Sequence, residues 1–407
     1  MTNLLVAQSG GPTAAINATL AGIIKEGQRQ GSIGTIYGSL HGIQGLLEEK
    51  LIDLGSQIDD KKLPCLCTTP AAALGSCRLK LKDMKEDDSE YHAILQILHK
   101  YQIGYFIYIG GNDSMDTVYK LSTYCREHEI HDICVVGAPK TIDNDLFGID
   151  HCPGFGSAAK YIATVCAELE REIEVYEVPN VIIVEMMGRN AGWLTAAAAL
   201  SAGVNSSVPY LIYLEERTFD MRKFIADVRE KLAEHQNVIV AVSEGIHDKN
   251  GKFISSMSQD DEETDAFGHQ QLAGTGKVLE KTVRKKIGCK VRSIELNLLQ
   301  RCASHLLSET DIRESFELGK NAVLLALNGE NGKMSSLRRI SDKPYQVVYE
   351  PVAIEEVANQ EKKVPKDWIN ENGNGVTDQM IAYLRPLIQG ETSCSYQNGI
   401  PKYIVLF

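Results

Sequence analysis

The sequence predicts an α/β protein with two doubly wound domains, mostly parallel sheets and a C-terminal extension. Short apolar runs alternate with helix-length amphipathic segments over most of the chain, which is typical of βαβ units. A length of 407 residues is too great for one ordinary core and indicates two domains. We expect a first domain over residues 1–155, a second over 156–300, and a C-terminal segment over 301–407 that returns to both.

Each expected element follows from a local pattern. Apolar residues at helical spacing predict a helix after Gly11 that Gly31 closes as C-cap, and a second helix with Ser89 as its N-terminal cap. Further helices are expected at about 190–202, 275–288 and 311–328, while the tail from about 340 is uninformative about chemistry. Apolar runs that end in glycine or polar residues predict strands at 4–7, 105–109, 133–137, 181–184, 211–214, 238–242 and 291–296.

The composition excludes several classes of protein. With 43% hydrophobic and 24% charged residues, no apolar run of membrane-spanning length and no basic start of a signal peptide, we expect a soluble globular chain. A formal net charge of −12 argues against general affinity for nucleic acid or anionic membranes. The ten cysteines lack disulfide or zinc spacing, so we expect free thiols in a cytoplasmic protein. The acidic run Asp260-Asp261-Glu262-Glu263 is expected to form an exposed loop.

One turn carries most of the chemistry, and we call it the Asp143 turn: Pro139-Lys140-Thr141-Ile142-Asp143-Asn144-Asp145. It follows the predicted strand at 133–137, at the kind of strand end where open α/β sheets bind ligands. One of its two carboxylates could take a proton from an attacking hydroxyl, and the other could hold a metal ion. Its lysine could neutralise a phosphate. The turn therefore predicts phosphate chemistry, provided that other strand ends supply phosphate cradles.

Two glycine pairs are candidates for those cradles. Gly10-Gly11 and Gly110-Gly111 both lie between a predicted strand and a predicted helix, where backbone N–H groups can approach a phosphate. Either pair alone is as consistent with a tight turn that binds nothing, but two equivalent pairs are a stronger signal. Asp113 follows the second pair, where it could hold a metal, repel a phosphate, or cap the helix together with Ser114.

Charged residues at other strand ends could bind a second phosphorylated substrate. Arg189 is either a phosphate clamp or a surface salt bridge. Glu244 could accept hydrogen bonds from sugar hydroxyls, and the pair Arg292 and Arg301 could grip a terminal phosphate. A partial dinucleotide fingerprint at 154–159 and a partial phosphate loop at 274–277 both fail in context, so we expect neither to bind a nucleotide.

Together these motifs resemble the phosphofructokinase family. The resemblance covers nearly the whole chain up to about residue 335 and rests on the order and spacing of motifs that are individually only modestly specific. In chain order they are Gly10-Gly11, Leu74-Gly75-Ser76-Cys77-Arg78, Gly110-Gly111-Asn112-Asp113-Ser114, the Asp143 turn, Met187-Gly188-Arg189, Ser243-Glu244-Gly245 and Leu299-Gln300-Arg301.

The resemblance implies a phosphofructokinase-like fold and transfer of a phosphoryl group to the 1-hydroxyl of fructose 6-phosphate. It implies that Asp143 is the general base on that hydroxyl, that Thr141 borders the transferring group, and that Arg189 stabilises transition-state charge. Arg301 and Arg292 would bind the 6-phosphate, and Leu298 replaces a histidine or aromatic residue that is common near the sugar. The implied acceptor-binding residues are Thr141, Ile142, Asp143, Met187, Gly188, Arg189, Glu244, Arg292, Leu298 and Arg301.

The same resemblance implies a donor site and a magnesium site. Asn112 and Asp145 would hold Mg²⁺, although most members carry an aspartate at the position of Asn112. Asn180 stands where ATP-using bacterial members place an arginine that reaches a neighbouring subunit. A homodimer or homotetramer is implied as well. The implied donor-binding residues are Gly10, Gly11, Arg78, Gly111 and Lys140.

The identity of the donor depends on two charged positions. Members that use ATP resemble one another in having glycine where this chain has Asp113 and Lys140, and the charged combination is similar to the diphosphate-dependent branch. Asp113 would repel the α-phosphate of a nucleotide by about 1–4 kcal/mol at about 4 Å. Lys140 would neutralise the departing phosphate, so both charged residues are expected to take part in catalysis.

Three alternatives stay open. One is an ATP-dependent phosphofructokinase that tolerates Asp113, and another is a non-catalytic sensor that binds sugar phosphates and a partner protein. The third is a nicotinamide-binding oxidoreductase, which the absence of a fingerprint in proper context disfavours. The preferred interpretation is a reversible, magnesium-dependent transfer from diphosphate to fructose 6-phosphate.

Overall fold

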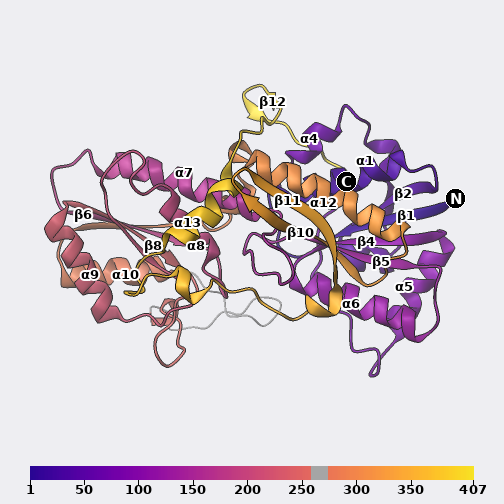
Figure 1. Ribbon diagram of the computed structural model, residues 1–407, viewed down its shortest axis with the longest axis horizontal. Coiled ribbons are helices and arrows are strands. Elements are labelled where there is room, and N and C mark those ends of the chain that lie inside the picture. The colour runs from indigo at the N-terminus through magenta and orange to yellow at the C-terminus, as the bar shows by residue number, and fades with distance from the viewer. Residues whose placement is uncertain (258–273) are drawn as a thin grey trace.

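Two sheets organise the chain in the computed structural model, which describes residues 1–257 and 274–407. The larger sheet has the strand order β11-β10-β5-β4-β1-β2-β3, and the smaller has the order β7-β8-β6-β9. Figure 1 shows each sheet in its own lobe with helices against its faces. Most strand pairs are parallel, which confirms the predicted α/β class. The predicted loop Asp260-Asp261-Glu262-Glu263 lies outside the described residues.

In the larger sheet, β1 (Thr2–Gln8) pairs in parallel with both β2 (Ile33–Ser39) and β4 (Ile103–Gly110), the central strand. β5 (Cys134–Pro139) continues the parallel order, and β3 (Leu51–Asp53) closes one edge as an antiparallel strand. Helices bury these strands from both faces, so β1, β4 and β5 read as continuous apolar runs. Their parallel arrangement brings the glycine pairs and the Asp143 turn to one edge of the sheet.

Helices α1 (Ile16–Arg29) and α12 (Glu309–Leu327) cross unusually closely on this lobe. A Cβ on Gly22 would lie 2.0 Å from the Phe316 carbonyl oxygen, and one on Gly319 would lie 2.1 Å from the Thr19 carbonyl oxygen. Only glycine therefore fits at these two positions. The crossing joins the N-terminal part of the chain to a helix that the sequence places almost 300 residues later.

Two predicted helix caps are wrong. Helix α1 ends at Arg29, and the residue after it, Gln30, is already extended, so the chain leaves the helix before Gly31 can close it. Helix α5 (Ser89–Lys100) begins at Ser89 itself, whose hydroxyl donates to the Asp87 carboxylate at 2.6 Å instead of accepting a helix N–H. In both cases the residue before the expected one occupies the cap position: Gln30 in α1 and Asp88 in α5.

The smaller sheet contains β6 (Asn180–Met186), β7 (Tyr210–Tyr213), β8 (Asn237–Ser243) and β9 (Lys290–Glu295), all parallel. Its covering helices are α7 (Phe155–Ile173), α9 (Met221–Glu234) and α10 (Thr275–Lys286). The single helix expected at 190–202 is instead two short pieces, α8 (Trp193–Ala196) and a 3-10 turn, η1 (Ala197–Leu200), because Asn190 to Gly192 still belong to the loop after β6.

The C-terminal segment returns to both lobes. β10 (Lys333–Asp342) pairs with β5, and β11 (Tyr345–Ala353) pairs with β10, so both strands extend the larger sheet. Helix α13 (Asp378–Leu384) then packs beside η1 of the other lobe, and the chain ends near α4 (Leu63–Cys67), as Figure 1 shows. Helix α6 (Asn112–Glu127) follows β4. Short elements elsewhere include the helices α2 (Gly42–Leu47), α3 (Leu54–Gln57) and α11 (Leu299–Cys302) and the paired strands β12 (Tyr396–Gln397) and β13 (Ile400–Pro401).

Two expectations from composition can be compared with the described part of the chain. Among those residues, the helices are too short or too polar to cross a membrane. The ten cysteines all lie within the described ranges and are all free thiols.

Candidate active site

The Asp143 turn is shaped by hydrogen bonds and by one left-handed residue. Its backbone leaves β5 where the Lys140 N–H donates to the Gly110 carbonyl oxygen at 2.9 Å, and the Asp143 N–H donates to the Thr141 hydroxyl at 3.1 Å. Asn144 then reverses the chain with a φ of +56°, a conformation that asparagine tolerates better than most residues. The Asn144 side chain accepts from the Cys152 N–H at 2.9 Å and donates to the Tyr383 hydroxyl at 2.9 Å. The turn is thus held from several sides.

A pocket of about 350 Å³ opens over this turn, between the two lobes. It gathers residues from the ends of β1, β4, β5 and β6, which confirms that the strand ends converge. It contains twelve of the predicted site residues: Gly10, Gly11, Gly111, Asn112, Asp113, Lys140, Thr141, Ile142, Asp143, Asp145, Met187 and Arg301. Six further lining residues were not predicted for this pocket: Pro12, Thr13, Lys80, Ser114, Asn190 and Glu361.

Lys140 is the buried cation of the pocket. Its side chain lies beneath the first glycine pair, where Nζ donates to the Gly11 carbonyl oxygen at 2.6 Å. A Cβ on Gly10 would lie 3.0 Å from Nζ, and Gly10 has a φ of +77°, so both space and backbone favour glycine there. Burial lowers the pKa of Lys140 to about 8, although the nearby Asp143 opposes that shift. The ammonium is therefore mostly charged at neutral pH and loses its proton as the pH rises through about 8.

Asp143 lies in the middle of the charged groups. Burial, followed by the charge of Asp145, raises the pKa of the Asp143 carboxyl above its usual range, while Lys140, Arg301 and Arg189 oppose the shift. A carboxylate with a raised pKa is a stronger base than an exposed one, and general bases work best when their pKa lies near the working pH. The environment of Asp143 thus suits proton abstraction.

Asn112 and Asp145 form a pair of oxygen-bearing side chains at the other side of the turn. The Asn112 amide donates through Nδ2 to Asp145 Oδ2 at 3.1 Å, which leaves the buried Asn112 Oδ1 without a partner. Burial raises the pKa of Asp145, and the neighbouring Glu361 raises it further. The described residues contain no group of three His, Cys, Asp or Glu side chains of the kind that encloses a metal. An amide oxygen without a partner beside a carboxylate instead fits Mg²⁺. This ion usually takes only one or two ligands from the protein, and water and phosphate oxygens supply the rest.

Asp113 does not cap helix α6, so that alternative is wrong. The N-terminal cap of α6 is Gly111, which offers no side chain, and the Asp113 carboxylate instead forms an ion pair with Lys80 Nζ at 2.8 Å. Both side chains are about half exposed at the pocket rim. Ser114 turns inward, where its hydroxyl lies 2.6 Å from the Ser9 hydroxyl. The negative charge at position 113 is therefore partly neutralised within the chain.

The second lobe contributes Gly188, Arg189 and Glu244. The Gly188 N–H donates to Glu244 Oε1 at 3.3 Å, and a Cβ on Gly245 would lie 2.1 Å from the Arg189 carbonyl oxygen, so the two strand-end loops touch. Burial and the charge of Asp143 raise the pKa of Glu244 to about 8. The Arg189 Nε is buried without a partner. The charges of Arg189 and Glu244 thus interact with that of Asp143, although neither residue lines the pocket itself.

Arg301 reaches the pocket from α11, and a Cβ on Gly11 would lie only 3.1 Å from its guanidinium. Burial lowers the pKa of Arg301, and Arg78 lowers it further, so two guanidinium groups lie near the first glycine pair. The structure does not bring Arg292 or Leu298 into the pocket: Arg292 is exposed on the edge strand β9, and Leu298 is 54% exposed before α11. Asn180 is buried at the start of β6, away from the pocket.

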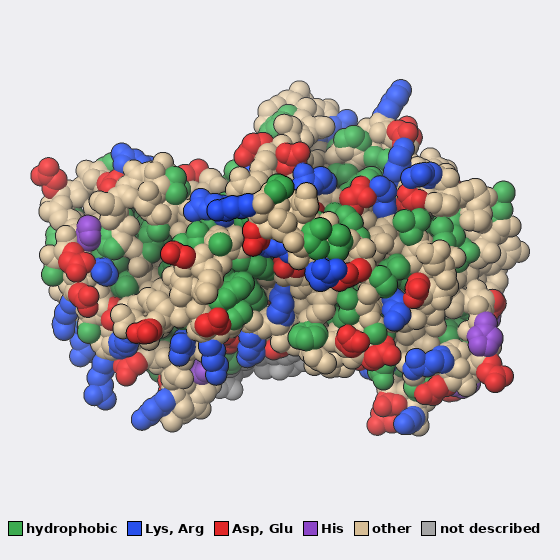
Figure 2. Space-filling view, viewed as in Figure 1, with side chains coloured by type: hydrophobic (Ala, Val, Ile, Leu, Met, Phe, Trp, Pro, Cys, Tyr) green, Lys and Arg blue, Asp and Glu red, His purple; other side chains and the backbone are tan. Residues whose placement is uncertain are grey.

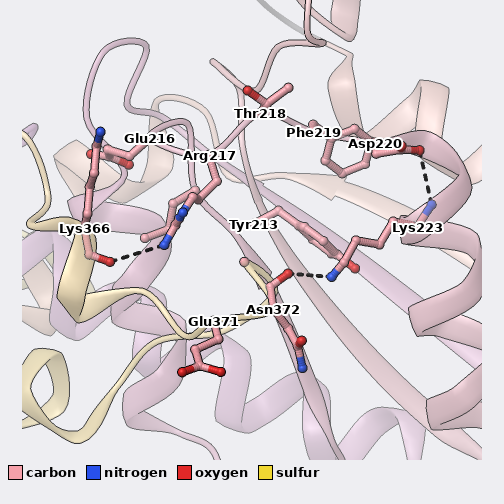
Figure 3. A pocket seen from close by; sticks show the side chains of 12 residues that line it. Tyr213, Glu216, Arg217, Thr218, Phe219, Asp220, Lys223, Lys366, Glu371 and Asn372 are labelled. Carbon is pink, nitrogen blue, oxygen red and sulfur yellow. Dashed lines mark hydrogen bonds between the residues drawn. The ribbon is translucent and has the colours of Figure 1, made fainter.

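A second pocket lies away from the Asp143 turn and contains none of the predicted site residues. Figure 3 shows this pocket, of about 360 Å³, where residues 366–373 pass the end of β7 and the start of α9. Its three acidic and three basic side chains balance, and Lys223 already donates to the Asn372 carbonyl oxygen at 2.5 Å. Figure 2 shows acidic and basic side chains interspersed over the face that it presents. The pocket over the Asp143 turn also mixes charges, but it places the buried Lys140 and the partly buried Arg301 beside Asp143 and Asp145.

Comparisons with known proteins point to one family. The phosphofructokinase family model matches residues 3–301. Similar relatives include proteins named pyrophosphate–fructose 6-phosphate 1-phosphotransferase from Halomonas elongata, 41% identical over 98% of this chain and 95% of that one, and from Xanthomonas campestris, 41% identical over 99% and 96%. The crystal structure of a pyrophosphate-dependent phosphofructokinase from Nitrosospira multiformis is 37% identical, covers 99% of this chain and 96% of that one, and superposes with a TM-score of 0.89.

Proposed function

Because the chain belongs to the phosphofructokinase family, we propose that it transfers a phosphoryl group from diphosphate to the 1-hydroxyl of fructose 6-phosphate. The products are fructose 1,6-bisphosphate and phosphate, and the reaction runs in both directions. The single observation that carries the proposal is the buried Lys140 beneath Gly10 and Gly11, on the same turn as the basic carboxylate of Asp143. Relatives about 40% identical along nearly the whole chain carry the corresponding name.

In the proposed mechanism Asp143 accepts the proton of the acceptor hydroxyl as that oxygen attacks the phosphorus atom. Arg189 and Arg301, whose charges already act on Asp143, stabilise the negative charge of the transferring group. Thr141 and Ile142 border that group from the turn. Most of the catalysis is positioning and charge neutralisation, because phosphoryl transfer asks for little covalent chemistry from the protein.

On the donor side, we propose that Gly10, Gly11 and Gly111 let backbone groups approach the diphosphate. Lys140 neutralises the departing phosphate from below, and Arg78 contributes charge from the neighbouring loop. Asp113, with Lys80, fills the rim of the pocket that a nucleotide would have to cross. This arrangement supports diphosphate over ATP, since a bare diphosphate needs no path past position 113.

Asn112 and Asp145 are the residues that would hold Mg²⁺. When bound, the ion supplies positive charge to the phosphate oxygens. The unpartnered Asn112 Oδ1 supports this assignment, because a buried amide oxygen otherwise lacks any bond.

For the acceptor, we propose that Met187, Gly188 and Glu244 bind the sugar and that Arg301 binds its 6-phosphate. Arg292 and Leu298 remain proposed acceptor-binding residues. Both side chains are exposed and lie outside the pocket of this chain, so they would contact the acceptor from outside that pocket. We also propose that residues 1–155 bind the donor, that residues 156–300 bind the acceptor, and that the protein is a cytoplasmic homodimer or homotetramer.

A coupled assay that follows fructose 1,6-bisphosphate with diphosphate or ATP as donor tests the proposal. We expect turnover with diphosphate and Mg²⁺ and little with ATP. Robust activity with ATP and none with diphosphate would show an ATP-dependent phosphofructokinase instead. Binding of fructose 6-phosphate in calorimetry without turnover from either donor would show a non-catalytic sensor.

A further inference from the structure

The C-terminal segment makes close contact with the Asp143 turn at residues 361–364, which no sequence motif marks. The Lys362 N–H donates to the Asp145 carbonyl oxygen at 2.7 Å, and Glu361 forms an antiparallel bridge with Leu146. A strand-like pairing therefore fixes the backbone on the far side of the turn. The pairing partners are more than 210 residues apart in the sequence.

The Lys362 ammonium reaches further into the same loop. Its Nζ donates to the Asp150 carbonyl oxygen at 2.7 Å, to the Ile149 carbonyl oxygen at 3.0 Å and to Asn144 Oδ1 at 3.3 Å. Three donors thus meet three oxygens, which fully satisfies a lysine. Asn144 is the left-handed residue between the two carboxylates, so one cation holds the residue on which the shape of the Asp143 turn depends.

The same segment is attached to the second lobe. The Trp193 indole N–H donates to the Lys362 carbonyl oxygen at 2.9 Å, and the Val364 N–H donates to Glu216 Oε1 at 3.0 Å. Asn190 donates to Glu361 Oε1 at 2.7 Å. The segment therefore touches the turn on one side and the loops after β6 and β7 on the other, so it fixes the turn relative to both lobes.

We infer that Lys362 is a positioning residue for phosphoryl transfer: its ammonium holds Asn144 and the following loop so that Asp143 and Asp145 present their carboxylates to the pocket. The inference deepens the proposed function and rests on it. Lys362 touches neither reacting group, so it acts through the turn. Displacing a catalytic group by about 1 Å can cost on the order of a hundredfold in rate.

Lys362→Met in the full chain tests this, because methionine keeps most of the side-chain length and removes the charge and all three donors. We expect kcat to fall about tenfold to a hundredfold, with little change in KM for either substrate. Hydrogen–deuterium exchange without substrates should become faster over residues 140–152. Lys362→Arg, which keeps the charge and donors, should recover part of the rate.

Lys363→Met is the matched control. Lys363 is the next residue, its side chain is 56% exposed, and its Nζ lies 3.7 Å from Glu215 Oε1. It should change neither kcat nor the exchange of 140–152. If Lys362→Met fails to fold, Trp193→Phe gives a second test. It removes the indole N–H that holds the Lys362 carbonyl oxygen, together with part of the buried ring 5.5 Å from the Lys362 ammonium, and should lower kcat while speeding exchange in the same residues.

Two results would overturn the inference: unchanged exchange over 140–152 in a folded Lys362→Met protein, or faster exchange with unchanged kcat. Failure of the proposed function looks different, because the wild type itself would then lack activity with diphosphate. The kinetic comparison would in that case be made with ATP, and the exchange measurement would decide independently of any donor whether Lys362 holds the turn.

Discussion

Substitutions at position 113 separate the charge of the side chain from its volume in the choice of donor. Asp113→Asn removes the charge and keeps the size, whereas Asp113→Gly removes both. Two like unit charges about 4 Å apart cost about 1 kcal/mol at a dielectric constant of about 80. That value suits a carboxylate whose side chain is 55% exposed, and the Lys80 ammonium 2.8 Å away reduces it further.

The charge alone therefore accounts for at most about a fivefold preference, since about 1.4 kcal/mol corresponds to tenfold. We expect Asp113→Asn to shift the ratio of kcat/KM for ATP to that for diphosphate by less than about fivefold. Asp113→Gly should shift it by more than about tenfold, because it also opens the pocket rim. Asp116→Asn, one turn on in α6 and paired with Lys120 at 2.8 Å, is the control and should leave the ratio unchanged. Equal shifts in the Asn and Gly variants at 113 would refute the argument from volume.

Three further predictions concern the turn. Asp143→Asn should lower kcat about 10²–10⁴-fold while fructose 6-phosphate still binds in calorimetry; a smaller loss would deny it the role of base. Since the pKa of Lys140 is lowered to about 8, its charge is present below that pH and lost above it, so kcat/KM for diphosphate should fall above about pH 8. Lys140→Arg should extend the pH range of activity upward. A fall in kcat/KM for diphosphate at the same pH as in the wild type would contradict this. Asp145→Asn should raise the Mg²⁺ concentration for half-maximal rate about 10–100-fold, and an unchanged requirement would place the metal elsewhere.

The sequence predicts those parts of the molecule that depend on neighbouring residues. Buried parallel strands read as apolar runs, and polar turns at their ends place Asp143, Lys140 and the glycine pairs at one sheet edge. The same reasoning fails for Arg292, because side chains alternate between the two faces of a sheet along a strand. Val291 is buried and Arg292 exposed, and a strand position alone does not tell which side an edge residue faces.

What the sequence could not predict is non-local. Glu361 and Lys362 reach the site from a segment without a motif, and their partners at 144–150 become visible only when the fold brings them together. The ion pair of Asp113 with Lys80 belongs to the same class, since 33 residues separate the two. The cap at Gly31 fails for another reason: helix ends are shifted by one or two residues by small differences in backbone geometry.

The order of strands in the larger sheet has a consequence for synthesis on the ribosome. β5 ends at residue 139, but its neighbour β10 begins only at residue 333, after the whole smaller sheet. At roughly 5–20 residues per second, the intervening stretch of about 190 residues takes about 10–40 s to emerge. Throughout that interval one side of β5 lacks its hydrogen-bonding neighbour, and an unprotected strand edge invites pairing with other chains. Nascent chains stalled before residue 333 should therefore depend on chaperones more than the completed protein does.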